Sequence, residues 1–168
     1  HILNTLLLEN GFNDLYVTLG IRDGDTPKYE KLRDALLKCK EMRNDSEKCE
    51  EKYFRGINCP LCAPNKSPLI YDLSGPKIAV KCESDHQFPF VIPTKEDMGK
   101  NVPDVLISNM WAVEYRITER VSQDRDLNLR FFKDLSTAIV DEAHEYVGLS
   151  GGVVSGLLRA ISLTSAAK

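Results

Sequence analysis

The amino-acid sequence predicts an α/β fold: a parallel sheet with flanking helices, interrupted by an inserted, cysteine-bearing β-hairpin. Apolar runs of strand length at 15–21, 103–109 and 138–140 alternate with helical stretches, a pattern typical of a parallel sheet covered on both faces. Residues 56–93 break this alternation, because they are rich in proline and glycine and contain a C-x2-C pair. This block is therefore expected to be an insert in the sheet.

The first elements follow from local pattern. The run "LYVTLGI" (15–21) has the β-branched and apolar composition of a strand, and "RDGDTP" (22–27) supplies turn residues directly after it. Residues 28–55 are densely charged, and an apolar face with helical spacing is formed by Leu32, Leu36 and Cys39. We expect an amphipathic helix, or a pair of helices, with a solvated face.

The later elements are assigned in the same way. "PLIYDL" (68–73) and "KIAVKC" (77–82) flank Ser74-Gly75-Pro76 and predict a hairpin. Residues 94–101 have the composition of a linker, and "PDVLISN" (103–109) that of a buried strand leading into a helix. "FFKDLSTAIVDEA" approaches a second buried strand, and "SGGVVSGLLRAI" predicts a helix for which Ser150 can serve as the N-cap.

Composition excludes some classes of protein. The 168 residues are 42% hydrophobic and 28% charged, with no apolar run long enough to cross a bilayer and no recognisable signal peptide. We therefore expect a cytoplasmic protein without a membrane partner. The formal net charge of −3 argues against a broadly basic nucleic-acid-binding surface, so any such contact has to be local.

The cysteines predict a metal site rather than a disulfide framework. Cys59 and Cys62 form a C-x2-C knuckle, the predicted hairpin follows, and Cys82 is then separated from His86 by three residues. This spacing is typical of a zinc ribbon, in which four protein ligands close a structural Zn²⁺ site. Cys49 is an alternative fourth ligand in place of His86, and Cys39 has no assigned role. The competing interpretation is a set of reduced, buried cysteines beside a surface histidine.

A charged cluster follows the apolar residues 138–140. Ligands bind at the carboxyl ends of strands in open α/β sheets, and Asp141 and Glu142 lie at such an end. In phosphoryl transfer one carboxylate holds Mg²⁺ and a second residue orients the attacking water. Asp141 and Glu142 are therefore candidate catalytic residues, and His144 can couple them to a neighbouring element. The competing interpretation is a polar turn that contains these residues by chance.

The sequence "VDEAH" (140–144) resembles the DEAH-type Walker B motif of superfamily-two helicases and translocases. "LYVTLGIRDGDTP", "PDVLISNMWAVEYRI" and "EYVGLSGGVVSGLLRAI" are similar, in the same order, to blocks of a DUF1998-associated helicase group. The resemblance does not cover residues 28–93. It implies part of a first RecA-like motor domain that uses ATP and Mg²⁺ on DNA or RNA, with Ser108 and Asn109 in the loop that touches the nucleic-acid backbone. From the residues alone, Asn109 is equally well explained as a helix N-cap.

The chain also departs from this helicase pattern. It contains no G-x-x-x-x-G-K-[ST] phosphate loop and no second motor domain. We therefore expect a fragment of an ATP-dependent helicase, inactive alone, whose partners are nucleic acid and the remainder of the motor. The expected domains are a partial RecA-like domain (1–27 and 102–168), a charged helical insert (28–55) and a zinc-ribbon-like insert (56–93). The alternative is a zinc-binding interaction module without catalysis.

Overall fold

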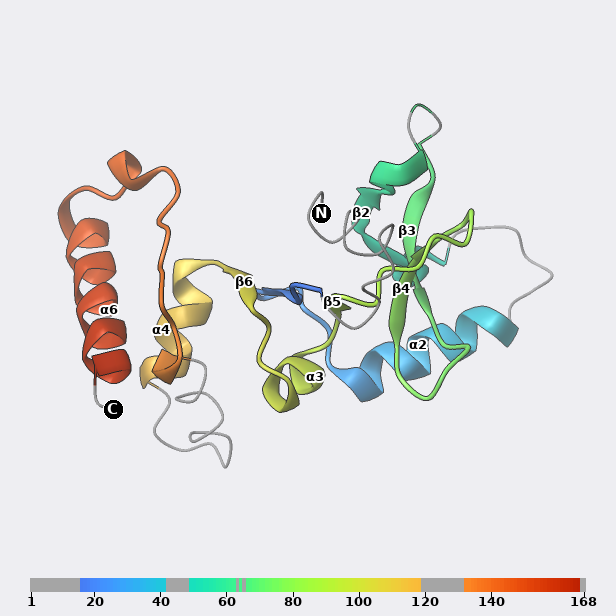
Figure 1. The fold of residues 1–168 in the computed structure, drawn as a ribbon, viewed down its shortest axis with the longest axis horizontal. Helices are drawn as coiled ribbons and strands as arrows, with labels where there is room; N and C mark the ends of the chain where they lie inside the picture. Colours follow the sequence, from blue (N-terminus) through green and yellow to red (C-terminus); the bar gives the residue numbers. More distant parts are fainter. Residues whose placement is uncertain (1–15, 42–48, 63, 65, 119–131, 167–168) are drawn as a thin grey trace. The chain divides into compact units, whose positions relative to one another are not determined.

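The computed structural model describes residues 16–41, 49–62, 64, 66–118 and 132–166 (Figure 1). The chain divides into two compact units, His1–Ile107 and Ser108–Lys168. The first unit contains two three-stranded sheets, and the second is built from helices.

The first sheet is parallel and confirms the expected α/β class. It has the order β5-β1-β6, formed by β5 (Val91–Ile92), β1 (Leu19–Arg22) and β6 (Val105–Ser108). β1 pairs with β5 in parallel register, with Leu19 opposite Val91. β6 was expected to be buried, but its apolar side chains are partly exposed, with 46% for Val105 and 54% for Ile107. The expected strand at 15–21 is shorter and begins later, and Leu15 lies outside the described residues.

Polar contacts hold β1 beside β6. The amide and hydroxyl of Thr18 both donate to the same Asp104 carboxylate oxygen, at 2.8 and 2.7 Å. The Asp104 amide in turn donates to the Thr18 hydroxyl at 2.9 Å. These reciprocal bonds lower the pKa of Asp104, because Thr18 stabilises the ionised carboxylate.

The segment expected to be a linker at 94–101 is instead a helix, α3 (Lys95–Lys100). Its N-cap is Thr94, whose hydroxyl accepts a hydrogen bond from the Asp97 amide at 3.2 Å. Met98 is fully buried and approaches Gly20 of β1 so closely that an added Cβ would lie 2.7 Å from its sulfur. The linker prediction was wrong because so short a helix needs only the Thr94 cap and one buried side chain, Met98, which packs against β1.

The second sheet is antiparallel, in the order β2-β3-β4, and contains the expected hairpin. β3 (Pro68–Asp72) pairs with β4 (Ala79–Cys82), with Tyr71 opposite Val80. β2 (Tyr53–Asn58) adds a third strand that the sequence pattern did not predict. Arg55 and Gly56 interrupt its alternation: both have positive φ, and the register shifts between Tyr53 and Asn58.

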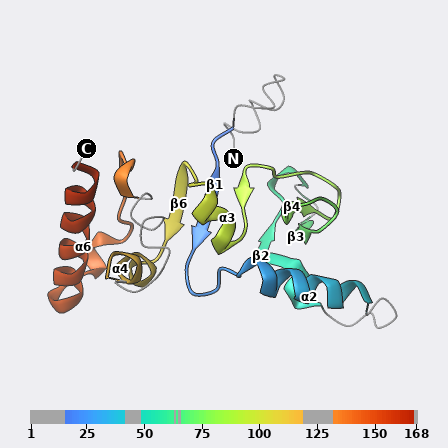
Figure 2. The same ribbon diagram turned by 90° about the horizontal axis from the view of Figure 1, so that it is seen from below.

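A single helix, α2 (Tyr29–Glu41), occupies most of the described part of the charged segment, and η1 (Glu50–Lys52) precedes β2. Leu32 and Leu36 are buried against Ile78, and this cluster places α2 against the second sheet (Figure 2). The expected amphipathic face is thereby confirmed. Residues 42–48 lie outside the described residues.

The second unit contains α4 (Met110–Thr118), the short η3 (Ala143–Glu145) and α6 (Gly148–Ala166), and α4 contacts α6. Both long helices were expected, although α6 begins two residues before Ser150, which is therefore not its N-cap. The buried strand expected at 138–140 was wrong: this segment has no regular structure, and Ile139 is 90% exposed. Among the described strands none pairs with it, and an unpaired strand cannot satisfy its backbone groups.

Candidate metal centre

Two of the predicted metal ligands lie on the connection between β2 and β3. Cys59 follows β2, and Cys62 ends the single 3-10 turn η2 (Pro60–Cys62). The Cys59 amide donates to the Ser67 carbonyl at 2.7 Å, and the Cys62 amide donates to the Cys59 carbonyl at 3.3 Å. These backbone bonds fold the C-x2-C sequence into a knuckle in which both thiols face the same point.

The other two ligands lie at the end of β4. The Cys82 amide donates to the His86 carbonyl and the Asp85 amide to the Cys82 carbonyl, both at 3.0 Å, so the chain reverses within four residues. Asp85 adopts the left-handed conformation that this turn requires, with a φ of 66°. The His86 amide also donates to the Cys82 sulfur at 3.3 Å. The turn thus brings the imidazole over the thiol of Cys82.

The four side chains meet with the spacing of a tetrahedral metal site. His86 Nδ1 lies 3.7, 3.3 and 3.3 Å from the sulfurs of Cys59, Cys62 and Cys82, and the last two sulfurs are 3.8 Å apart. Metal bonds of about 2.3 Å to sulfur and about 2.0 Å to nitrogen imply separations of about 3.8 Å between sulfurs and about 3.6 Å between sulfur and nitrogen. The cluster can therefore hold a metal ion, as its donor set indicates.

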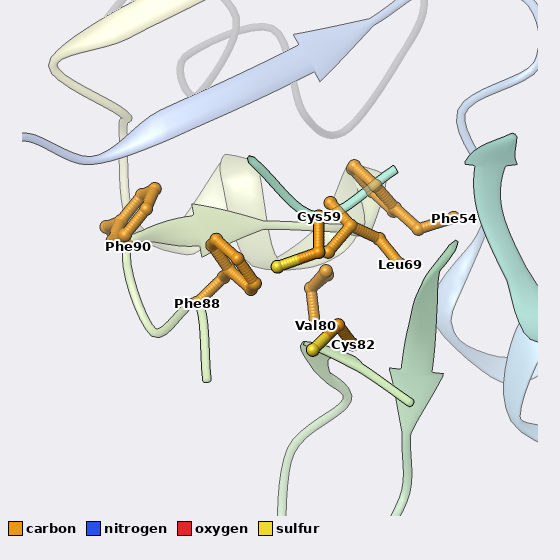
Figure 3. Close-up of a cluster of buried hydrophobic side chains, with 7 residues drawn as sticks. All are labelled: Phe54, Cys59, Leu69, Val80, Cys82, Phe88 and Phe90. Carbon is orange, nitrogen blue, oxygen red and sulfur yellow. The ribbon is translucent and has the colours of Figure 1, made fainter. Parts of the chain in front are cut away.

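Two of the four candidate ligands, Cys59 and Cys82, belong to the cluster of buried hydrophobic side chains shown in Figure 3. Cys59 and Cys82 are 4% and 1% exposed, Cys62 is half-buried, and His86 is more exposed than either buried cysteine. The buried thiols pack among the apolar side chains of Phe54, Leu69, Val80, Phe88 and Phe90. A metal held here would link the knuckle and the β4 turn at one end of this core.

The pKa values of the two buried thiols are shifted in opposite directions. Burial raises the pKa of Cys59 to about 11. Burial also opposes ionisation of Cys82, but hydrogen bonds from the backbone and ring of His86 outweigh it and lower the pKa of Cys82 to about 6. Of the two buried thiols, Cys82 is therefore the one that ionises more readily to an anionic ligand, and binding of a cation would favour the thiolate form of Cys59.

The structure also decides between the two candidates for the fourth ligand. Cys49 lies in a disulfide with Cys39 and is thereby committed elsewhere, whereas His86 is within reach of all three other ligands. The sequence favoured a metal site over a disulfide framework and left Cys39 without a role; the structure pairs Cys39 with Cys49. The two residues are 10 positions apart in the sequence and their Cα atoms are 5.8 Å apart, a separation that a disulfide spans.

The predicted catalytic residues lie in the second unit and are exposed. Glu142 precedes η3 with a φ of 48°, and its amide donates a hydrogen bond of 2.9 Å to the Asp141 carboxylate. His144 Nδ1 lies 3.4 Å from a Glu142 carboxylate oxygen, with 75% and 67% of the two side chains exposed. The structure brings Asp141, Glu142 and His144 together on one turn, and their catalytic role stays a prediction.

The residues predicted to contact nucleic acid, Ser108 and Asn109, lie directly before α4. The Asn109 side-chain oxygen accepts a hydrogen bond from the Ala112 amide at 2.8 Å, the geometry of an N-cap for α4. The Ser108 hydroxyl donates to the Asn109 carbonyl at 3.4 Å. The N-cap interpretation of Asn109 is thus confirmed, and contact of either residue with nucleic acid stays a prediction.

One polar cluster was missed by the sequence interpretation. Arg55 of β2 donates two hydrogen bonds of 2.8 Å to Asp23, one to each carboxylate oxygen, and a third of 2.9 Å to the Thr26 hydroxyl. The residues "RDGDTP" did predict a turn, but nothing in the sequence pairs it with an arginine 32 residues away. Only the folded chain places the two segments together.

Searches of protein-family models, of curated proteins and of solved structures found no match to the chain. Among the residues that the structure describes, no helix is long and apolar enough to cross a membrane.

Proposed function

We propose that Cys59, Cys62, Cys82 and His86 form a structural zinc centre. The observation that carries this proposal is the convergence of three sulfurs and one imidazole nitrogen within 4.8 Å of one another. Three thiolates with one imidazole suit Zn²⁺, which is bound tetrahedrally by soft and borderline ligands. Four protein ligands leave no position for water or substrate, and this favours a structural role over a catalytic one.

The centre would stabilise the lobe formed by β2, β3 and β4. The apolar cluster around it is small, and its buried members include two of the ligands themselves. A core of this size supplies little of the free energy that ordering the segment costs, whereas metal binding is coupled directly to folding. Zn²⁺ would join the β2–β3 knuckle to the end of β4.

Metal content tests this proposal directly. The purified chain should contain about one zinc per molecule, since one site has four ligands. Co²⁺ substituted for zinc should give the intense visible absorption of a tetrahedral ion with thiolate ligands, and this absorption should be lost in the Cys62→Ser variant. Metal-free protein with a folded, protease-resistant lobe would reject the zinc centre in favour of packed, reduced cysteines.

We further propose that the chain is part of an ATP-dependent helicase or translocase of the DEAH type. Support comes from the sequence blocks that resemble this group and from their local structure. β1 is followed by the Asp23–Thr26 turn, and β6 leads through Asn109 directly into α4. A strand-to-turn and a strand-to-helix connection at the ends of parallel strands are the positions at which such a fold binds its ligands.

In this proposal Asp141 would hold Mg²⁺ through water and Glu142 would orient the water that attacks ATP. The test uses the full-length protein that contains this chain. Glu142→Gln should abolish ATP hydrolysis and leave nucleotide binding intact, because only the positioning of water is lost. Glu145→Gln, on the same turn, is the matched control and should hydrolyse ATP at the wild-type rate. Normal hydrolysis by the Glu142→Gln variant would exclude the assigned role.

A further inference from the structure

The turn that follows β1 is organised around one carboxylate. The amides of Asp25 and Thr26 both donate to the same Asp23 oxygen, at 3.0 and 2.9 Å. The Thr26 hydroxyl accepts from the Asp23 amide and donates to the Ile21 carbonyl, both at 2.9 Å. Thr26 is 3% exposed, so its polar groups depend on these partners rather than on water.

Arg55, in strand β2 of the second sheet, binds this turn through its side chain. Its guanidinium donates hydrogen bonds to both Asp23 carboxylate oxygens and to the Thr26 hydroxyl. Only 21% of the arginine side chain and 24% of the aspartate side chain are exposed. A bidentate arginine–carboxylate pair is directional as well as strong, so it fixes the relative position of the two side chains. The guanidinium also lowers the pKa of Asp23 well below its usual value, and the carboxylate stays ionised at neutral pH.

The backbone beneath Arg55 is strained. Arg55 has a φ of 56° and Gly56 a φ of 65°, a conformation that a residue with a side chain rarely adopts. Such a conformation persists only where the surrounding structure enforces it. On one side of Arg55, Phe54 is fixed in the core; on the other, Gly56 continues into the ligand Cys59. Cys59, a ligand of the proposed metal centre, thus lies three residues after Gly56 on the segment that carries Arg55.

We propose that metal binding and the conformation of the Asp23–Thr26 turn are coupled through Arg55. When the metal is bound, it fixes Cys59, and this maintains the bulge at Arg55 and Gly56. The Arg55 guanidinium then keeps its hydrogen bonds to Asp23. Without it, the end of β2 is released, the bulge relaxes toward ordinary strand geometry, and Arg55 withdraws from the turn. This inference rests on the proposed metal centre. In a helicase of the kind proposed above, this coupling would make the conformation of the loop after β1 depend on whether the zinc centre is occupied.

Amide hydrogen exchange on the whole chain tests the coupling. The reporters are the amides of Asp25 and Thr26, which Asp23 protects, and the references are the amides of Met98 in α3 and of Asn101, its C-cap. Removal of zinc with a chelator should raise the exchange rates of the reporters by roughly tenfold, the effect expected on loss of a charge-assisted hydrogen bond. The reference amides should keep their protection.

Arg55→Leu separates the route from the metal itself. Zinc-loaded Arg55→Leu should retain its zinc and show the fast reporter exchange of the metal-free wild type, and removal of zinc should then add no further effect. The matched control is Lys52→Met, which removes the exposed ion pair with Glu83 on the same lobe and should respond to zinc like the wild type. Arg55→Lys keeps the charge without the paired hydrogen bonds and should resemble Arg55→Leu.

The other outcomes are decisive. Unchanged reporter protection in zinc-loaded Arg55→Leu, or unchanged protection on removal of bound zinc, would overturn the coupling and leave the metal centre in place. Equal loss of protection in the reporter and reference amides would show that zinc stabilises the whole unit without a route through Arg55, and it would overturn the proposal as well. A chain that binds no zinc at all would instead reject the metal centre on which the coupling rests.

Discussion

Cys62→Ser is the most informative single substitution in the proposed zinc centre. Cys59 and Cys82 are buried in the core, so their replacement damages packing as well as the metal site. Cys62 is half-buried, and serine has nearly the same shape, so the variant removes a ligand and leaves the apolar cluster intact. Any large effect is then an effect of the metal.

The size of this effect follows from linkage. When free zinc is at about 1,000 times its dissociation constant, binding stabilises the folded state by roughly 4.1 kcal/mol. If Cys62→Ser abolishes tight binding, this contribution is lost. For a unit of about 100 residues, at the lower estimate of about 4 °C per kcal/mol, the Tm falls by roughly 16 °C.

Thermal unfolding with and without a chelator is the assay. The wild type should lose stability on removal of zinc, and Cys62→Ser should behave like the metal-free wild type under both conditions. The double variant Cys39→Ser, Cys49→Ser is the matched control: it should keep its zinc, because neither residue belongs to the four-ligand cluster. A Cys62→Ser variant that binds zinc with wild-type stability would refute the reasoning, as would a wild type whose Tm ignores the chelator.

Three further predictions concern the scaffold. Asp23→Asn should destabilise the first unit by about 1.5–3 kcal/mol, the range for a hydrogen bond to a charged group. Because its partnership with Arg55 depresses the folded-state pKa of Asp23 below the ordinary 3.8, this stabilisation is present above pH 3.8 and is lost only as pH falls below it. Urea unfolding between pH 5 and 8 should therefore show a constant difference from wild type, and a difference that disappears within this range would contradict the assignment. Gly20→Ala should cost roughly 1–3 kcal/mol in the same assay, because the new Cβ would meet Met98 and Pro103 at 2.7 and 2.8 Å. The control Gly99→Ala, in α3 with nothing within 4 Å of the added carbon, should stabilise instead by about 0.5 kcal/mol, and equal effects of the two would exclude the close approach. Asn109→Ala should lower the stability of the second unit by about 1 kcal/mol through loss of the α4 cap, with Asn109→Ser close to wild type, and two equally destabilised variants would show that the cap is not what matters.

The sequence by itself determined the features that depend on neighbours along the chain. The C-x2-C knuckle and the four-residue return from Cys82 to His86 are local turns, so their spacing was sufficient to predict which groups converge once the hairpin between them was recognised. The amphipathic face of α2 and the helices α4 and α6 are visible for the same reason, since helical periodicity is a property of a short window.

Tertiary structure decided everything that depends on segments distant in the sequence. The choice of His86 over Cys49 depended on a disulfide that removes Cys49, and the pairing of Arg55 with Asp23 joins residues 32 positions apart. The apolar run at 138–140 shows the converse. Its composition suits a buried strand, but a strand exists only where a partner satisfies its backbone, and no described strand provides one. Hydrophobic pattern specifies what a segment can bury, whereas the surrounding fold decides whether anything covers it.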